Sequence, residues 1–373
     1  MASSEPPEIV ATGCALAEMI RHVRDAGTFA FDSEFIGELS YVSRLCLIQV
    51  ATTRKVFLVD PLAGVDLAGF WDLLTCPEAE TIVLAGQQDL APAVLRTSKG
   101  PANIMDVQIA AGFVHGQYPL SLARLVQEFV GVSLPKALAF TCWDRRPLSA
   151  VQVKYAADDV RFLPAAREAI GKRLTDLGRV AWAREECAAV LEDLSQYRPA
   201  PESLYLRVRG RDRLRRRNLA VLRELAIVRD RAARQEDVPA RTLLRDGILV
   251  ALASRPARTL ADLDAIRGLP RPVEAKYGRW IVDATAKAMT LPEDCLPPVE
   301  PDDTPAMRKR VDEAWERISQ FCLAQSIAPS LVASRKEVFH LCCAARAGEP
   351  LEQHRLGRGW RKEFLGPILA SLL

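Results

Sequence analysis

The apolar and polar positions divide the chain into two parts of different character. The first half holds short apolar runs that stop at turn residues, as strands do. These runs are TFAFDSEF at 28–35, LCLIQVA at 45–51, KVFLV at 55–59 and TIVLA at 81–85. Strands in close succession predict an antiparallel start to a sheet, whereas residues 121–130 and 149–170 have apolar positions at helical spacing. This order predicts an α/β domain in which helices pack on a mixed sheet.

Beyond about residue 197 the sequence has almost no strand signal. Residues 211–290 show amphipathic helical patterns, with breaks expected at Gly247, Pro256, Gly268 and Pro270. The stretch LPEDCLPPVEPDDTP has the composition of a solvated linker, and the remainder is helical again. The expected division is an α/β domain at 1–200, a helical domain at 203–290, a linker at 291–305 and a second helical domain at 306–373.

Composition narrows the class of protein. The 373 residues are 49% hydrophobic and 26% charged, which is enough apolar material for more than one core. A formal net charge of +3 permits a nucleic-acid partner but does not demand one. The nine cysteines and four histidines show no zinc-site spacing, which is typical of reduced thiols in a cytosolic protein. Without a signal peptide or an apolar run of about 20 residues, a soluble cytoplasmic enzyme is expected.

Two acidic residues stand two positions apart on the first predicted strand. Side chains two apart on a strand share a face, so Asp32 and Glu34 would project together, while Phe29, Phe31 and Phe35 would cover the opposite face. Like charges on a partly buried strand repel each other and lose hydration, and Mg²⁺ or Mn²⁺ would offset both costs. Acids that simply face water at a strand end explain the same pattern, so the pair alone does not decide.

Two later positions could belong to the same chemistry. Asp89 follows the strand expected at 81–85, where sites on open α/β sheets gather, although a first-turn acid that favours the helix dipole is an alternative. Tyr155 and Asp159 are four apart and would share a helix face, where a tyrosine hydroxyl could orient a water beside a metal-bound carboxylate. Asp158 competes for that face, and the spacing does not choose between the two acids.

Taken in order, these motifs resemble the tyrosine-bearing branch of the DEDD exonuclease superfamily, and most closely the ribonuclease D family. The matching stretches are FDSEF, LCLIQV, LVDPL, LAGQQDL, MDVQIAAGF and RPLSAVQVKYAADDV, together with the helical tail. The resemblance covers nearly the whole chain. It implies a ribonuclease H-like exonuclease domain followed by two HRDC-like domains, which are small helical nucleic-acid-binding modules.

The resemblance also implies roles for individual residues. The four metal-binding acids would be Asp32, Glu34, Asp89 and Asp159, which would hold two divalent ions, and Tyr155 would orient the attacking water. Asp158 would then be a neighbour. The implied activity is that of a metal-dependent 3′–5′ exoribonuclease, which hydrolyses RNA from its 3′ end and releases nucleoside 5′-monophosphates. The implied partner is RNA with an accessible 3′ end, such as a tRNA precursor, and the expected form is a monomer.

Two positions depart from the family pattern. Members often have histidine near the start of the second motif, where this chain has Leu84. The segment before RPL often carries Ser-Asp-Trp, whereas this chain has Thr141, Cys142 and Trp143. Neither departure removes an expected metal ligand, but a substrate or packing contact near Cys142 can differ.

Basic residues provide the candidate RNA contacts. Arginines are dense at Arg207, Arg209, Arg211, Arg213, Arg215, Arg216 and Arg217. Such a run can hold a phosphate backbone with little sequence preference, although a solvated helix start paired to Asp212 or Glu224 is an alternative. The chosen RNA-binding candidates are Lys136, Arg146, Arg215 and Arg216. A further basic edge is expected in the last helical domain at Arg355, Arg358, Arg361 and Lys362.

Two other functions remain open from the sequence. A DNA 3′–5′ exonuclease of the same superfamily would use identical carboxylates, and a non-catalytic RNA-binding protein could keep the fold. A helicase or a nicotinamide enzyme is disfavoured because neither G-x-x-x-x-G-K-S/T nor G-x-G-x-x-G after the first strand is present. We therefore expect no nucleotide cofactor and no membrane association.

Overall fold

The computed structural model describes residues 5–37, 39–135, 142–192, 194–299, 301 and 304–369. The chain forms two compact units. The first consists of Met1–Glu34, Leu45–Leu194 and Asp303–Leu373, and the second of Phe35–Arg44 and Ser195–Asp302. Among the described residues, no helix is long and apolar enough to cross a lipid bilayer.

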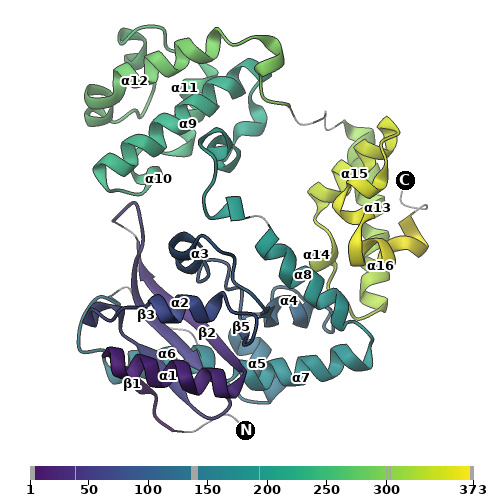
Figure 1. The fold of residues 1–373 in the computed structure, drawn as a ribbon. Coiled ribbons are helices and arrows are strands. Elements are labelled where there is room, and N and C mark those ends of the chain that lie inside the picture. Colours follow the sequence, from purple (N-terminus) through teal and green to yellow (C-terminus); the bar gives the residue numbers. More distant parts are fainter. Residues whose placement is uncertain are drawn as a thin grey trace. The chain divides into compact units, whose positions relative to one another are not determined.

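A six-stranded mixed sheet with the order β1-β4-β3-β2-β5-β6 forms the centre of the first unit (Figure 1). The strands are β1 (Glu8–Val10), β2 (Thr28–Ile36), β3 (Arg44–Ala51), β4 (Val56–Val59), β5 (Glu80–Val83) and β6 (Ile104–Asp106). β3 and β4 are antiparallel, whereas β1 and β4, β2 and β5, and β5 and β6 pair in parallel. The mixed sheet and its antiparallel start are therefore confirmed. The register pairs Ala30 with Ile82, so β5 ends beside the middle of the longer strand β2.

Helices cover both faces of this sheet (Figure 1). They are α1 (Gly13–Ala26), α2 (Ala68–Leu74), α3 (Ala91–Thr97), α4 (Val107–Gly112), α5 (Leu122–Val130), α6 (Ala150–Arg161), α7 (Leu163–Asp176) and α8 (Val180–Glu192), with a short 3₁₀ turn η1 (Pro61–Ala63). Phe29 and Phe31 pack with α1 and α2 in one core, while Ala30 packs with α4, α5, α6 and α7 in another. Successive residues of β2 thus face opposite layers.

The helix expected at 149–170 is two helices. Ser149 and Gln152 form a reciprocal capping box that starts α6, as the sequence S-x-x-Q allows. The chain changes direction at Phe162, and Pro164 lies in the first turn of α7, where its missing N–H costs nothing. Apolar periodicity continues through this junction, which explains why the pattern suggested a single helix.

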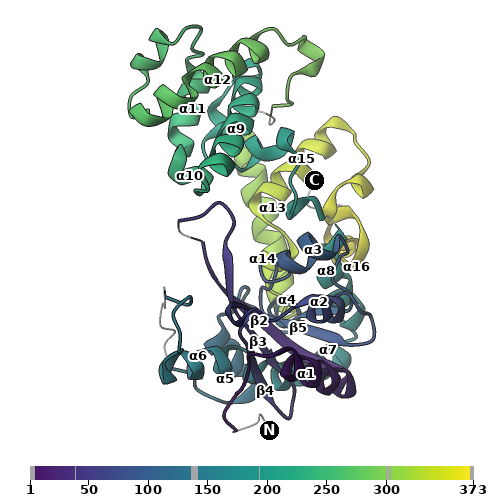
Figure 2. The same ribbon diagram turned by 60° about the vertical axis from the view of Figure 1, so that its left-hand side comes forward.

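The C-terminal helices belong to the first unit. They are α13 (Pro305–Ala324), α14 (Pro329–Val332), α15 (Arg335–Ala347) and α16 (Gly359–Leu369), with 3₁₀ turns η7 (Leu351–Gln353) and η8 (Arg355–Gly357). They share the core that includes α4 and α8, and both views place α16 beside α8 (Figure 1, Figure 2). The Trp360 ring meets the Phe113 ring edge-on at 4.7 Å between centroids.

A buried ion pair joins the C-terminal helices to α8. Arg361, 4% exposed, donates two hydrogen bonds to the Glu186 carboxylate, and Trp360 Nε1 donates a third at 2.8 Å. Arg355 also donates to Glu186, and Lys362 pairs with Glu352. The expected basic edge is therefore wrong for Arg361, which is buried in this ion pair, whereas Arg355 and Lys362 stay exposed and each has an acidic partner.

The second unit is helical in its described residues from 195 to 299. It contains η2 (Leu194–Gln196, whose first residue belongs to the first unit), η3 (Pro201–Arg207), η4 (Arg211–Arg213), α9 (Arg216–Glu236), α10 (Ala240–Leu243), α11 (Asp246–Ser254), η5 (Ala261–Ala265), α12 (Arg271–Met289) and η6 (Glu293–Cys295). Gly247, where a break was expected, lies in the first turn of α11, and the break precedes it at Leu244 and Arg245. Leu296, inside the segment expected to be a linker, is buried in this core.

Candidate active site

The D-x-E pair lies on β2 as expected. Phe31 faces the α1–α2 core and Ala30 faces the opposite core, so alternation places Asp32 and Glu34 on the side of α4–α7. Both acids are half-buried near the end of the strand. This alternation confirms the predicted shared face, and the Glu34 charge is one of the causes that raise the pKa of Asp32.

Helix α6 contributes Tyr155 and Asp159 to the same place. The charge of Asp159 raises the pKa values of both Asp32 and Glu34, and it also raises that of Tyr155. Asp158 is different, because it pairs with Lys154 and lies 3.5 Å from the Arg161 guanidinium. The surroundings of the two acids therefore differ: Asp158 is paired with neighbouring cations, whereas the charge of Asp159 acts on Asp32 and Glu34.

Asp89 reaches the site from the turn that follows β5. Its neighbours Leu90 and Ala93 pack in the α1–α2 core, on the side opposite to Glu34. Ser33, whose side chain alternates to that side, donates its hydroxyl proton to Asp89 Oδ1. The charge of Asp89 nevertheless acts on Asp32 and Glu34. Sequence reasoning did not predict the Ser33 contact, because the middle residue of D-x-E gives no signal of its own.

Among the described residues, the charges that raise the pKa values of these four half-buried acids are those of other acids. Burial, followed by the charges of Asp89 and Asp159, raises the pKa of Asp32 well above its usual value. Burial and the same two acids raise the pKa of Glu34 to about 7, and burial followed by the Asp158 charge raises that of Asp159 to about 7. Burial also raises the pKa of Asp89, although the Ser33 hydrogen bond counteracts it. A dication beside these groups would reverse the shifts.

The donor set suits a hard divalent cation. Mg²⁺ and Mn²⁺ prefer carboxylate oxygens, and this cluster offers four carboxylates without histidine or thiolate. Within the described part of the chain, no three acidic, histidine or cysteine side chains lie close enough together to ligate one ion.

Tyr155 is held as a protonated hydroxyl. Burial, followed by the charges of Asp159, Glu34 and Asp32, raises the pKa of Tyr155 to about 12. At neutral pH the side chain can therefore donate and accept hydrogen bonds but does not act as an anionic base. Trp143, 2% exposed, packs against the Tyr155 ring at 6.1 Å between centroids.

Of the residues predicted to contact RNA in the first unit, Arg146 is described and is already engaged by other groups of the chain. Lys136 and Thr141 lie outside the described residues. The Arg146 guanidinium donates to both Asp60 oxygens and to the carbonyls of Cys46 and Trp143, so it supports the segment that carries Trp143. A phosphate at Arg146 would have to compete with Asp60.

The arginine run is also partly used by its own unit. Arg216 donates to the carbonyls of Leu296 and Pro297, and Arg217 donates to Leu291 and Glu293. These contacts fasten the segment after α12 to α9. Arg215, the residue before α9, is exposed. Arg216 is exposed as well, but its guanidinium already donates to two carbonyls, and Arg217 is half-buried.

The departures from the family pattern have simple structural settings. Leu84 is half-buried and packs against the core shared with α4 and α7. The Cys142 carbonyl accepts a hydrogen bond from Gln152 Nε2 at 3.4 Å, which ties this segment to the start of α6. Both positions therefore contribute to packing, and neither takes the place of a carboxylate.

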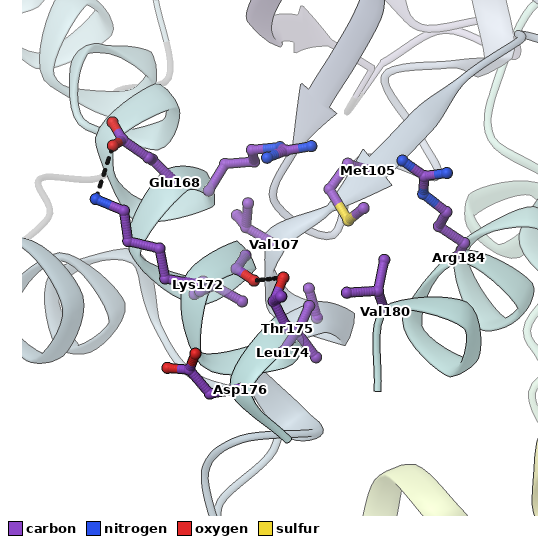
Figure 3. Close-up of a pocket in the computed structure, with 13 residues that line it drawn as sticks. Met105, Val107, Glu168, Lys172, Leu174, Thr175, Asp176, Val180 and Arg184 are labelled. Atoms are coloured by element: carbon purple, nitrogen blue, oxygen red, sulfur yellow. Dashed lines mark hydrogen bonds and ion pairs between the residues drawn. The ribbon is translucent and has the colours of Figure 1, made fainter. Parts of the chain in front are cut away.

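A cavity of about 450 Å³ lies elsewhere in the first unit, between β6, α4, α7 and α8 (Figure 3). Met105, Val107, Leu174 and Val180 supply an apolar lining. Polar groups at its rim already have partners: Glu168 pairs with Lys172 at 2.9 Å, and Thr175 donates to a backbone carbonyl (Figure 3). None of the five expected site residues lines this cavity, so it is not the place for metal-dependent chemistry.

Comparisons with known proteins agree with this geometry. A family model described as 3′-5′ exonuclease matches residues 7–175, and an HRDC domain model matches residues 218–285. Ribonuclease D of Gluconacetobacter diazotrophicus is 33% identical over 98% of this chain and 92% of its own length. Ribonuclease D of Escherichia coli is 30% identical over 98% of both chains.

The likeness extends to three dimensions. The crystal structure of Escherichia coli RNase D, described as an exoribonuclease involved in structured RNA processing, superposes with a TM-score of 0.84 at 28% identity and covers 99% of both chains. Sequence identity, domain models and fold agree over essentially the whole length. The chain therefore belongs to the ribonuclease D family of 3′–5′ exonucleases.

Proposed function

We propose that this chain removes nucleotides from the 3′ end of RNA by hydrolysis that uses two divalent metal ions, Mg²⁺ or Mn²⁺. The observation that carries the proposal is the cluster of Asp32, Glu34, Asp89 and Asp159, whose raised pKa values reflect buried acids without a countercharge. Strongly perturbed acids gathered in one place are typical of functional sites. The family membership supplies the direction of trimming.

Each residue has a role that follows from its position. Bound divalent ions would supply a nucleophile at neutral pH and stabilise charge on the leaving oxygen. Asp32 lies within electrostatic reach of the other three acids, which suits a ligand shared by both ions. The charge of Asp159 acts on Glu34, and these two acids would form one side of the site, with Asp89 on the other. Protonated Tyr155 would hold and orient the attacking water through its hydroxyl.

RNA is the proposed substrate. The Escherichia coli relative is described as an exoribonuclease that processes structured RNA, and precursors of tRNA are the substrate class we propose. The matched HRDC domain at 218–285 would add contacts to the phosphate backbone, with Arg215 as the first candidate of the proposed set and Lys136, Arg146 and Arg216 as weaker candidates. A monomer in the cytoplasm is the proposed working form.

A timed digestion tests the proposal. A 3′-tailed RNA and its DNA counterpart are incubated with Mg²⁺, with Mn²⁺ or with EDTA, using the intact chain, Asp32→Asn and Asp158→Asn. We expect one-nucleotide laddering of RNA from the 3′ end with metal. EDTA and Asp32→Asn should abolish it. Asp158→Asn is the matched control, because Asp158 is already paired with Lys154 and Arg161.

The other outcomes each favour a different function. Equal or faster trimming of DNA would indicate a DNA exonuclease of the same superfamily, because the carboxylate chemistry is the same for both polymers. Binding of RNA without cleavage under either metal would contradict the enzymatic proposal and leave an RNA-binding protein on this fold.

A further inference from the structure

Asp106 is a buried acid in the first unit that the proposed mechanism does not use. It is the last residue of β6 and the residue before α4, and it is 8% exposed. Its Oδ1 accepts the backbone N–H of Gln108 at 2.9 Å and that of Ile109 at 3.4 Å. These two hydrogen bonds cap α4, which is an ordinary task for aspartate at this position.

The same oxygen also holds a second segment. Asp106 Oδ1 accepts the backbone N–H of Ala85 at 3.1 Å. The parallel register of β5 and β6 pairs Val83 with Asp106, which brings the end of β6 beside the turn that leaves β5. One carboxylate therefore connects the start of α4 to this turn.

The turn after β5 needs such support. Ala85 has a φ of +54°, in the left-handed region that L residues other than glycine seldom adopt. A Cβ at Gly86 would lie 2.5 Å from Val83 Cβ, so the chain passes close to its own strand here. A conformation of this kind persists when contacts from outside the turn stabilise it.

The supported turn carries Asp89. The Gly86 carbonyl accepts the Leu90 N–H at 3.0 Å, so residues 86–90 form one compact turn with Asp89 inside it. Ser33 holds the Asp89 carboxylate directly from β2. Asp89 is thus held from one side by Ser33, and the beginning of its turn is held from the other side by Asp106.

We propose that Asp106 is a positioning residue for the exonuclease reaction, which holds the Ala85–Gly86 turn so that Asp89 reaches the acids of β2. The inference rests on the proposed function, because it takes Asp89 as a metal ligand. Asp106 does not touch the reacting atoms. Its effect is on the affinity of the site for metal and on the turnover rate, and not on the binding of RNA.

Substitutions can separate this role from helix capping. Asp106→Asn keeps an oxygen at the same reach, so both sets of hydrogen bonds can form. Asp106→Ser keeps a good capping oxygen for α4, but its side chain is one bond shorter and leaves Ala85 without its acceptor. Ser121→Ala is the matched control, because Ser121 caps α5 in the same unit and has no contact with the Asp89 turn.

Two measurements on the 373-residue chain report the effect of Asp106→Ser on the metal affinity of the site. The first is the Mn²⁺ concentration that gives half of the metal-dependent rise in melting temperature. The second is steady-state trimming of a 3′-tailed RNA, which gives kcat, the KM for RNA and the Mn²⁺ midpoint. We expect Asp106→Ser to need roughly tenfold more Mn²⁺ in both assays, as loss of an outer contact at a metal site commonly does. The KM for RNA should stay the same.

The controls make the outcomes distinct. Asp106→Asn should stay within about threefold of the unaltered chain, and Ser121→Ala should lower the melting temperature without moving the Mn²⁺ midpoint. A midpoint for Asp106→Ser equal to that of the unaltered chain would overturn the positioning role while leaving the metal site intact. Absence of any Mn²⁺-dependent shift in the unaltered chain would overturn the proposed function, and this inference with it.

Discussion

Two groups of buried carboxylates in the first unit have opposite electrostatic surroundings. One group consists of Asp32, Glu34, Asp89 and Asp159, and the other is Glu186 on α8. In the first group the neighbouring charges are other acids, and the pKa of Asp159 rises to about 7. Burial alone would raise the pKa of Glu186 as well, but hydrogen bonds from Arg361 and Trp360 and the charge of Arg355 hold it below its usual value.

The difference shows how acids of a ligand-binding site can be distinguished from an acid with a purely structural role. Burial disfavours the charged form in both places, so burial by itself does not mark a site. Glu186 is completed by partners within the chain, and it joins α8 to the C-terminal helices. The acids of β2, α6 and the turn after β5 have no cationic partner among the described residues. A ligand of opposite charge is therefore expected at the cluster of Asp32, Glu34, Asp89 and Asp159 and not at Glu186.

The largest expected effect is a difference in kcat between substitutions at two adjacent residues of α6, Asp158 and Asp159. Asp159→Asn should lower kcat for RNA trimming by roughly 10³-fold, at the upper end of what loss of one preorganised electrostatic contact costs. Asp158→Asn should change kcat little, because Asp158 already pairs with Lys154 and Arg161. Initial rates at saturating Mn²⁺ measure both. Equal losses in the two variants would show that the assignment of Asp159 is wrong.

The next largest effect is expected on the stability of the chain when Glu186 is replaced. Glu186→Gln leaves the buried Arg361 cation without its partner, and removal of one member of a buried pair typically costs about 3–5 kcal/mol of unfolding free energy. Urea unfolding followed by circular dichroism measures this change.

Glu168→Gln is the matched control for Glu186→Gln. Glu168→Gln removes an exposed partner of Lys172 and should have little effect on unfolding. If Glu186→Gln were as mild as Glu168→Gln, the buried pair would not be the contact that fastens α16 to α8.

A smaller effect is expected at the water-orienting position. Tyr155→Phe keeps the ring that packs on Trp143 but removes the hydroxyl, so kcat should fall by about 100-fold while the Mn²⁺ midpoint and the KM for RNA remain unchanged. Because the pKa of Tyr155 is about 12, the rate should show no tyrosine ionisation between about pH 7 and 9. A changed Mn²⁺ midpoint would instead indicate that Tyr155 acts on the metal site.

The smallest effect is the pH dependence of the metal-free chain. Asp159 has an ordinary pKa of 3.8 that folding raises to about 7, so its protonated form favours the native state. The associated stability is present below pH 3.8 and is lost as the pH rises through about 7. Between pH 5 and pH 8 the loss is at most roughly 3 kcal/mol. Urea unfolding in EDTA at pH 5 and pH 8 should show this loss. Asp159→Asn should reduce it.

The Glu186 contact should contribute the opposite slope. Its lowered pKa means that stability is present above the ordinary value of 4.5 and is lost as the pH falls through the folded-state pKa. A metal-free chain whose stability between pH 5 and 8 did not depend on Asp159 would contradict the assignment of an uncompensated acid cluster.

Several elements could be predicted from the sequence because their signals are local. Strands β2 to β5 appear as apolar runs bounded by turn residues, and β2 and β3 lie within a residue of their expected bounds. The three-residue strands β1 and β6 were not predicted, because so short a run gives no periodic signal. The shared face of Asp32 and Glu34 follows from the two-residue period of a strand. The resemblance then assigned Asp159 over Asp158, and the salt bridges of Asp158 supply a physical reason for that assignment.

Other features depend on residues far apart in the chain. Arg361 looked like part of a basic edge, but Glu186 lies 175 positions away and turns it into a buried partner. Arg146 looked like a phosphate contact, but Asp60 and the Cys46 carbonyl take up its guanidinium. A charged residue shows its type in the sequence, whereas its partner becomes known only when the fold brings that partner within reach.

The sequence by itself determined the order of the strands and helices along the chain, the face that the D-x-E acids share and the set of acids available for metal. Hydrophobic periodicity and short-range geometry carry that information. Only the tertiary structure decided that Asp89 arrives from the opposite side of β2 through Ser33, that Asp106 holds its turn, and that Glu186 is neutralised while the acid cluster is not. These are contacts across sequence separations of 21 to 175 residues, and their energies exist only once packing has removed water from between the partners.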